Sequence, residues 1–143
     1  MCGLTGSLEF EPATPAETLA RQVKAMADTL HHRGPDSDGQ WLDAKAGIAL
    51  GFRRLAIIDL SEHGAQPMAS HDGRYVIVYN GEVYNFPEMR AELTAQGHEF
   101  NGHSDTEVIL AAIVEWGLEA AVKRFVGMFA IALWDCRERT LRL

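Results

Sequence analysis

Residues 74–85 read Arg-Tyr-Val-Ile-Val-Tyr-Asn-Gly-Glu-Val-Tyr-Asn, and this stretch shows the sheet-forming character of the chain most directly. Its first part, 74–79, is rich in Val, Ile and Tyr, which favour a pleated sheet, so we expect a strand there. The Asn80-Gly81 pair that follows has two interpretations. It is an ordinary turn after a strand, or it offers a side-chain amide beside a backbone N–H as two hydrogen-bond donors.

Upstream, a helix is expected between two sheet segments. Residues 2–10 mix small and β-prone residues as a strand does, and 40–60 predicts two short strands around Ala46-Gly47. Between them, Thr14-Pro15-Ala16-Glu17 offers an N-cap, a first-turn proline and a capping-box glutamate. The helix should end near Gly34-Pro35, and its apolar face consists of Leu19, Val23, Met26, Ala27 and Leu30.

Downstream, helices precede a hairpin. Residues 86–96 predict a short helix closed by Gly97, and Ser104-Asp105-Thr106-Glu107 is a second capping box that opens a helix through Trp116 to Gly117. The helix pattern continues over 118–125. Residues 129–134 and 140–143 look like a hairpin whose second strand is cut short, so we expect the fold to be truncated at its C-terminal end. Blocks of strands and helices favour an α+β class with antiparallel sheet over a doubly wound parallel sheet.

Length and composition bound the class of protein. The chain has 143 residues, of which 47% are hydrophobic and 23% charged, without a linker or repeat, so a single globular domain over 1–143 is expected. Lys plus Arg number 13 against 20 Asp plus Glu, a net charge of −7 that disfavours nucleic acid and anionic membranes as partners. The N-terminus lacks a signal-peptide pattern, and two cysteines form no disulfide framework, so we expect a reduced, cytoplasmic protein.

Cys2 is the candidate nucleophile. A small residue after Met1 allows the initiator methionine to be removed, which would leave a thiol and a free α-amine on one residue. Such an amine titrates near ~7.7–8.0 and can accept a proton, while cysteine is the nucleophile that depends least on activation. Taken alone, Cys2 is better interpreted as a small, half-buried residue at the start of a strand, and only the motifs that accompany it favour the nucleophile.

Four further motifs accompany Cys2 in order along the chain: Arg33-Gly34-Pro35-Asp36, Arg54-Leu55-Ala56-Ile57-Ile58-Asp59, Asn80-Gly81-Glu82-Val83-Tyr84-Asn85 and Ser104-Asp105-Thr106-Glu107. With these motifs the whole chain resembles the N-terminal glutaminase domain of glutamine-dependent asparagine synthetases, which are class II glutamine amidotransferases with an N-terminal-nucleophile fold. The resemblance implies a four-layer αββα sandwich in which two antiparallel sheets pack face to face.

The resemblance also implies roles for the principal site residues. The guanidinium of Arg54 would hold the α-carboxylate of glutamine, while Arg53 faces the other way if the segment is a strand. Asp105 would pair with the α-ammonium, although a helix N-terminus favours an acid there in any case. Asn80 and Gly81 would donate to the oxyanion.

Supporting roles follow from the same resemblance. Glu82 would add a substrate contact, and Leu55 and Ile57 would line the pocket, with backbone carbonyls able to accept from the ammonium. Asn85 is expected to order its loop. Arg33 matches a residue near the nucleophile and either orients Cys2 or only pins the turn.

No metal or cofactor is predicted for this part of the protein. The six histidines show no metal-ligand spacing with the cysteines. Cys136 lies in a charged segment without a nearby base and is interpreted as an incidental thiol. The sequence departs from many relatives at Phe52, where they carry His, and we expect little effect from this change.

The implied activity is hydrolysis of L-glutamine to L-glutamate and ammonia. In the resembled enzymes a C-terminal synthetase domain uses ATP and Mg²⁺, but these 143 residues contain no Ser-Gly-Gly-x-Asp-Ser type motif, so we expect that domain to be absent from this chain. Partners would be glutamine, the synthetase domain and, because the family is often dimeric, a second copy. The final ammonia acceptor and the oligomeric state stay open.

Two alternatives to a glutaminase domain of the asparagine synthetase type remain. One is the glutaminase domain of a phosphoribosyl-pyrophosphate or fructose-6-phosphate amidotransferase, which typically carries an Arg-x-Ala-Thr-x-Gly type stretch where this chain has residues 54–59. The other is a non-catalytic structural module. The presence of Cys2 together with Arg54, Asn80, Gly81 and Asp105 disfavours the second alternative.

Overall fold

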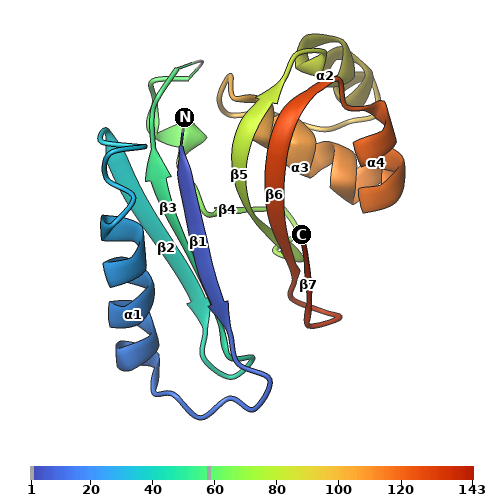
Figure 1. The fold of residues 1–143 in the computed structure, drawn as a ribbon. Coiled ribbons are helices and arrows are strands. Elements are labelled where there is room, and N and C mark those ends of the chain that lie inside the picture. Colours follow the sequence, from blue (N-terminus) through green and yellow to red (C-terminus); the bar gives the residue numbers. More distant parts are fainter. Residues whose placement is uncertain (1, 58) are drawn as a thin grey trace. The chain divides into compact units, whose positions relative to one another are not determined.

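A computed structural model of the chain describes residues 2–57 and 59–143. They fold as two compact units, which are described one by one (Figure 1). Unit 1 runs to Ala56 and includes Ala65–Pro67, and unit 2 consists of Ile57–Gly64 with Met68–Leu143. No linker composition marks these boundaries in the sequence, and the prediction of one domain over 1–143 stays a prediction.

Unit 1 is a three-stranded antiparallel sheet with one helix. The sheet has the order β1-β3-β2, and its elements are β1 (Gly3–Leu8), α1 (Ala16–Asp28), β2 (Ser37–Asp43) and β3 (Ile48–Arg54). Helix α1 lies along one face of this sheet (Figure 1), where Leu19 and Val23 pack against Ala49 of β3. The predicted strands and a helix with a buried apolar face are confirmed, but the predicted helix end near Gly34-Pro35 is wrong, and of the predicted face Met26 is exposed and Leu30 lies beyond the helix.

The predicted capping box at the start of α1 is wrong. The N-cap position belongs to Pro15, which has no side chain able to cap, and the Thr14 hydroxyl instead donates to the Glu9 carboxylate. The hydrogen bond from Thr14, followed by those from two backbone N–H groups, lowers the pKa of Glu9. An ionised carboxylate is the stronger acceptor for the hydroxyl, so Thr14 is used to close the preceding loop. The helix ends at Asp28, and turns occupy residues 29–33.

Unit 2 is a four-stranded antiparallel sheet with three helices on one face (Figure 1). The strand order is β4-β5-β6-β7. Its elements are the short helix η1 (Glu62–Gly64), β4 (Met68–Ala69), β5 (Tyr75–Val83), α2 (Phe86–Ala95), α3 (Asp105–Trp116), α4 (Leu118–Arg124), β6 (Gly127–Asp135) and β7 (Thr140–Arg142). The predicted helices and the final hairpin are confirmed, as is the α+β class with antiparallel sheets.

The core of unit 2 fixes α3 against β5. Ile109 and Ile113 of α3 are fully buried against a cluster that includes Tyr79 and Val83 of β5 and Leu133 of β6. Full burial of one large aliphatic side chain stabilises a fold by about 1.5–3 kcal/mol, so this cluster holds the helix firmly. The start of α3 is thereby placed beside the end of β5.

Strand β5 is longer than predicted. It continues through Asn80 and Gly81 to Val83 and pairs with β6, so the interpretation of Asn80-Gly81 as a turn is wrong. A Cβ on Gly81 would lie 2.2 Å from the carbonyl oxygen of Met128, and one on Gly127 would lie 2.0 Å from that of Glu82. The two glycines therefore let the backbones of β5 and β6 approach closely at this end.

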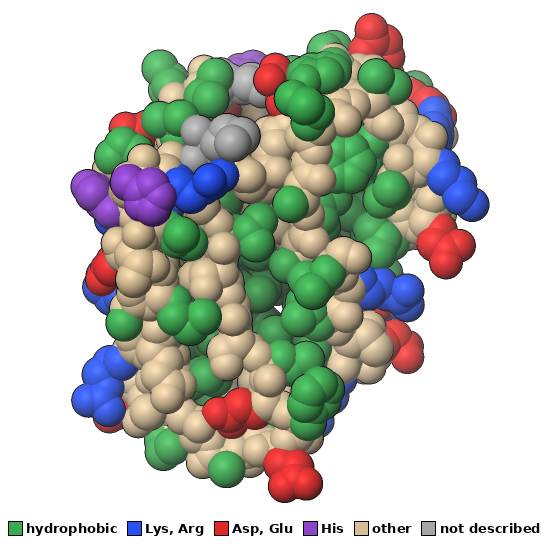
Figure 2. Space-filling view, viewed as in Figure 1, with side chains coloured by type: hydrophobic (Ala, Val, Ile, Leu, Met, Phe, Trp, Pro, Cys, Tyr) green, Lys and Arg blue, Asp and Glu red, His purple; other side chains and the backbone are tan. Residues whose placement is uncertain are grey.

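The surface shows no single charged face in the view of Figure 2, where Lys and Arg side chains stand in small separate groups. Over the described residues, no helix has the length and hydrophobicity that crossing a bilayer requires. The longest helix of unit 2, α3, has 12 residues.

Candidate active site

Cys2 directly precedes β1 and is half-buried. Its sulfur contacts Leu55, the residue that follows β3: the Leu55 N–H donates to Sγ at 3.3 Å, and the thiol donates to the Leu55 carbonyl oxygen at 3.5 Å. Both partners are backbone groups, so the position of the sulfur depends on the course of the chain after β3.

Arg33 contacts the main chain of Cys2. Its Nε donates to the Cys2 carbonyl oxygen at 3.0 Å. Of the two roles that the sequence left open, this hydrogen bond favours orientation of Cys2, because it holds the carbonyl group of the same residue that carries the thiol. The contact links the turn after α1 to the start of β1.

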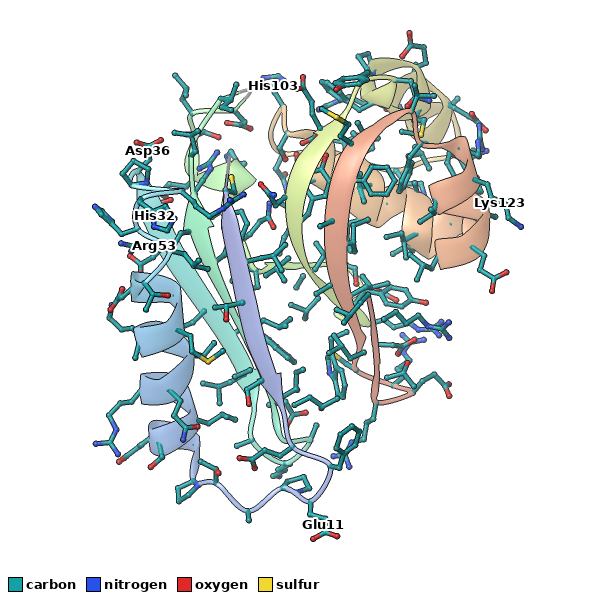
Figure 3. The ribbon with its side chains drawn as sticks, viewed as in Figure 1. Glu11, His32, Asp36, Arg53, His103 and Lys123 are labelled. Carbon is teal, nitrogen blue, oxygen red and sulfur yellow. The ribbon has the colours of Figure 1, made fainter. Side chains whose placement is uncertain are left out.

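The rest of the Arg33–Asp36 motif shapes the segment after β3. Gly34 passes so close to β3 that a Cβ would lie 2.3 Å from the Arg53 carbonyl oxygen. Asp36 donates its N–H to the Arg54 carbonyl at 3.0 Å and accepts from the Ala56 N–H at 2.8 Å through Oδ2. Figure 3 shows Asp36 and Arg53 at the same end of unit 1, with Glu11 at the opposite end. The motif therefore contacts the backbone on both sides of Leu55 and fixes the course of the chain at Arg54 and Leu55.

The two neighbouring arginines of β3 differ. The side chain of Arg53 is only 12% exposed and forms ion pairs with Asp38 at 3.4 Å and Asp28 at 3.8 Å. A solvent-facing Arg53 is therefore excluded. Because neighbouring strand residues face opposite sides, Arg54 points away from this acidic pair. Its assignment to the substrate carboxylate stays a prediction.

In unit 2, the first residue of α3 is a buried acid. Asp105 is 6% exposed, and its Oδ2 accepts hydrogen bonds from the Tyr79 hydroxyl at 2.6 Å and from the Val83 N–H at 3.1 Å. Burial, followed by the hydrogen bond to Asp105, raises the pKa of Tyr79 well above its ordinary value. Tyr79 therefore remains a hydrogen-bond donor at every physiological pH.

The predicted capping box before α3 is confirmed in one half only. Ser104 Oγ accepts from the Glu107 N–H at 3.4 Å, as an N-cap does. The Glu107 carboxylate does not return to Ser104 but accepts from the N–H groups of Asn101 at 3.1 Å and Gly102 at 2.8 Å. It therefore orders the loop that leads into the helix.

Asp59 is a residue of the quoted motifs to which the sequence assigned no role. It is buried, and it accepts from the Ser61 N–H at 2.7 Å and from the His103 N–H at 2.7 Å. Figure 3 shows His103 in the loop before α3. The Asp-x-Ser spacing is typical of an aspartate that closes a local turn, but the long-range bond to His103 leaves no mark in the sequence.

The predicted oxyanion and substrate residues follow one another along β5. Tyr79 and Val83 belong to the core beneath the helices, so Asn80 and Glu82 take the alternate positions of the strand. Asn80 is half-buried, whereas Gly81 and Glu82 are exposed. Their assigned roles stay predictions.

A protein-family model described as "Glutamine amidotransferase domain" matches residues 1–143. The chain belongs to this family. It is a class II glutamine amidotransferase domain, similar to the N-terminal region of glutamine-hydrolysing asparagine synthetases.

Curated relatives of this amidotransferase domain include two from Bacillus subtilis. Asparagine synthetase [glutamine-hydrolyzing] 1 is 44% identical over 141 residues, and asparagine synthetase [glutamine-hydrolyzing] 3 is 42% identical over 143. Each alignment covers 99% of this chain and 22% of the relative. The chain thus spans about a fifth of the length of these relatives.

Among solved structures, the domain is similar to a glutamine phosphoribosylpyrophosphate amidotransferase from Bacillus subtilis that was solved with ADP and GMP. The TM-score is 0.74 at 18% sequence identity, and the match covers 92% of this chain and 35% of the other. At this identity the similarity concerns the fold.

Within the amidotransferase domain, the predicted site residues divide between the units. Unit 1 brings Cys2, Arg33 and Leu55 into direct contact. Unit 2 carries the β5 residues, Asp105, and Ile57, a residue that is 71% exposed. Met1, whose removal is predicted, and Ile58 of the second motif lie outside the described residues.

Asn85 orders a loop, as predicted. Its side chain donates to the Arg124 carbonyl oxygen at 2.9 Å and accepts from the Val126 N–H at 2.9 Å. It therefore ties the end of β5 to the segment that enters β6.

Among residues 2–57 and 59–143, no three His, Cys, Asp or Glu side chains form a group that could hold a metal ion.

Proposed function

We propose that this domain hydrolyses L-glutamine to L-glutamate and ammonia, with Cys2 as the nucleophile. The observation that carries the proposal is the placement of Cys2. In a chain that matches the family over its full length, the second residue has its sulfur held by Leu55 and its carbonyl held by Arg33. A residue that only filled space at a strand start would need neither contact.

The chemistry requires the α-amine of Cys2 to be free. This amine takes the thiol proton, through a water molecule, while Sγ forms a bond to the side-chain carbonyl carbon of glutamine. The C–N bond then breaks as the nitrogen receives the proton, and ammonia leaves. Water attacks the resulting γ-glutamyl thioester, which releases glutamate and restores the thiol.

Selectivity for glutamine is assigned to one cation and one anion. Arg54 presents a planar guanidinium that can hold the α-carboxylate bidentately. Asp105 supports the complementary role, because a buried carboxylate is normally paired with a positive charge, and none of the described Lys, Arg or His side chains forms an ion pair with it. The α-ammonium of glutamine would supply that charge. Leu55, Ile57 and Glu82 belong to the same proposal as lining residues.

Asn80 and Gly81 are assigned to the oxyanion that forms when Sγ attacks. A side-chain amide and a backbone N–H aimed at the developing charge stabilise a tetrahedral intermediate. A Cβ at position 81 would collide with the Met128 carbonyl oxygen, so only glycine fits there and any contribution of this position to the site comes from its backbone.

The complete fold and the use of the ammonia extend the proposal. Unit 1 supplies an antiparallel sheet with one helix on a face and unit 2 an antiparallel sheet with three, which supports the four-layer αββα sandwich of a single domain over 1–143. The names of the relatives support delivery of ammonia to a C-terminal synthetase domain of the same polypeptide or complex. ATP and Mg²⁺ are expected only for that domain, and a homodimer and a cytoplasmic location belong to the same expectation.

The test joins intact-mass analysis of the N-terminus to a glutaminase assay on the same sample. Protein that begins at Cys2 should release glutamate from glutamine, and protein that retains Met1 should be inactive, because its Cys2 nitrogen is an amide and cannot act as a base. Full activity with Met1 retained would refute the α-amine mechanism. Inactivity of protein that begins at Cys2 would favour the non-catalytic module.

A glutamine analogue with an electrophilic side chain provides a second readout on the same protein. It should add a single label at Cys2, with Cys136 as the internal control, since both thiols are half-buried and neither forms a disulfide. Labelling of both cysteines at equal rates would contradict a specific site at Cys2.

A further inference from the structure

The three buried aspartates of unit 2 have different partners. Asp135 is paired with the guanidinium of Arg74 at 2.8 Å. Asp59 uses both carboxylate oxygens, Oδ1 with Ser61 and Oδ2 with His103. Asp105 differs from both, because its hydrogen bonds all end on Oδ2, and Oδ1 has no hydrogen-bond partner among the described residues.

The two donors to Asp105 come from opposite ends of one strand segment. Tyr79 and Val83 are four residues apart on β5, and a strand rises about 3.3 Å per residue, so their backbone positions are about 13 Å apart although both donors reach the same oxygen, Oδ2. The Val83 N–H is fixed by the fold, whereas the Tyr79 hydroxyl reaches Oδ2 through a side chain that is 3% exposed. With both bonds in place, rotation of the carboxylate is prevented.

In the hydrogen bond between Tyr79 and Asp105, the Tyr79 hydroxyl is always the donor. Burial and the neighbouring carboxylate raise the pKa of Tyr79, so the hydroxyl donates and Oδ2 accepts throughout the range in which the enzyme would work. A permanent donor on one oxygen leaves the other oxygen as the acceptor for an incoming group.

We propose that Tyr79 is a positioning residue for glutamine recognition: its hydroxyl fixes Oδ2 of Asp105 so that Oδ1 is presented to the α-ammonium of the substrate. This inference rests on the proposed function, in which Asp105 receives that ammonium. Tyr79 acts only through Asp105 and touches no reacting atom.

The test is Tyr79→Phe in the full chain with a verified N-terminus, measured by steady-state glutaminase kinetics. We expect KM for glutamine to rise about tenfold with kcat within about twofold, since a hydrogen bond to a charged group is lost while the reacting residues are unchanged. A purely structural role would lower the active fraction, and therefore kcat, and leave KM unchanged. That second outcome would overturn the proposal.

Tyr75→Phe is the matched control. It removes a hydroxyl from the same strand and the same face, four residues away, and its ring also packs against the unit 2 core. It should leave KM unchanged. An equal rise in KM for both variants would show a general effect of β5 and would overturn the specific role of Tyr79.

A double-mutant cycle with Asp105→Asn decides whether Tyr79 acts through Asp105. Tyr79→Phe should raise KM in the parent but add nothing in the Asp105→Asn background. Additive effects would overturn the proposal. If Asp105→Asn alone leaves KM unchanged while Cys2→Ala abolishes activity, the recognition role of Asp105 fails and the proposed glutaminase function stands. If Cys2→Ala retains activity, the proposed function itself fails.

Discussion

The two units hold their principal site residues in opposite ways. In unit 1, Cys2 is half-buried and contacted by backbone groups of Leu55, so the thiol is positioned while its surroundings stay accessible. In unit 2, Asp105 is buried and gripped by Tyr79 and Val83. The difference suits the proposed roles. A nucleophile must meet the substrate and then water, whereas a recognition carboxylate gains strength when water is excluded.

The largest expected effect tests the unit 1 side of this comparison. Cys2→Ala should abolish glutamine hydrolysis, a loss of at least about 1000-fold, because no covalent intermediate can form. The fold should persist, since only two weak sulfur contacts are lost. Glutamate release and circular dichroism on the same sample check both statements. Turnover close to the parent would contradict the nucleophile assignment.

Asn80→Ala tests whether unit 2 contributes to the chemical step as well as to recognition. Its kcat should fall about 100- to 1000-fold, the effect of losing one oxyanion donor worth about 2.7–4 kcal/mol, and KM should change less. Steady-state kinetics separate the two parameters. A rise in KM at constant kcat would place Asn80 in recognition and remove it from the oxyanion site.

Arg54→Ala and Arg53→Ala form a matched pair on β3. Arg54→Ala should raise KM for glutamine about 100-fold, because a bidentate partner of the α-carboxylate is lost, and Arg54→Lys should restore only part of it. Arg53→Ala should leave KM unchanged but lower the stability of unit 1, since Asp28 and Asp38 lose their partner. Equal KM effects would show that the facing of the two side chains is wrong.

Gly81→Ala tests the close approach of β5 and β6. The added methyl would meet the Met128 carbonyl oxygen, so the variant should lose about 1–3 kcal/mol in the free energy of unfolding, together with activity. Gly97→Ala is the control, because no atom lies within 4 Å of its Cβ and only its positive φ is strained. Urea unfolding of both variants gives the comparison. A loss no larger than that of Gly97→Ala would show that β5 and β6 move apart to accommodate the methyl group, and would contradict the crowding at position 81.

The smallest expected effect is on how the stability of unit 2 depends on pH, through Asp135. Burial of the Asp135 carboxyl favours a higher pKa, but hydrogen bonds from Arg74 and from two backbone N–H groups outweigh it and lower the pKa. A carboxyl whose pKa is lower in the folded state stabilises the fold above its unfolded pKa and loses that contribution as pH falls through the folded value. Asp135→Asn should therefore be less stable at neutral pH and lose less stability between about pH 5 and 2.

Urea unfolding across this pH range checks the prediction for Asp135. Glu119→Gln, on the exposed side of α4, is the control and should unfold like the parent at each pH. An unchanged acid response in Asp135→Asn would show that the Arg74 pair does not contribute to the acid sensitivity of the fold.

Local patterns in the sequence were sufficient for most elements of the fold. The Val, Ile and Tyr run of β5 and the spacing of Leu19 and Val23 in α1 depend on neighbours in the chain, so they could be interpreted without coordinates. The capping boxes were wrong where a side chain has its partner outside the box, whereas Ser104 caps α3 as predicted. The Thr14 hydroxyl donates to the Glu9 carboxylate, and the Glu107 carboxylate accepts from N–H groups of the loop before α3.

The candidate site shows the same division. The residue types of Cys2, Arg54 and Asp105 could be recognised from ordered motifs, whereas the contacts that orient them could not. Tyr79 is an ordinary strand residue until α3, 26 residues later, brings Asp105 to its hydroxyl. Such a partnership depends on tertiary packing alone, and no spacing rule reveals it.

The hydrogen bonds from Tyr79 and Val83 of β5 to Asp105 also favour one register of β5 against β6. A shift of β5 by one residue along β6 would exchange its two faces, turning Tyr79 and Val83 away from α3 and Glu82 toward it. Asp105 would then lose both donors and face a second carboxylate in the core, a state that costs far more than the lost contacts. The same carboxylate that is proposed to recognise a substrate thereby penalises a misaligned strand while the chain folds.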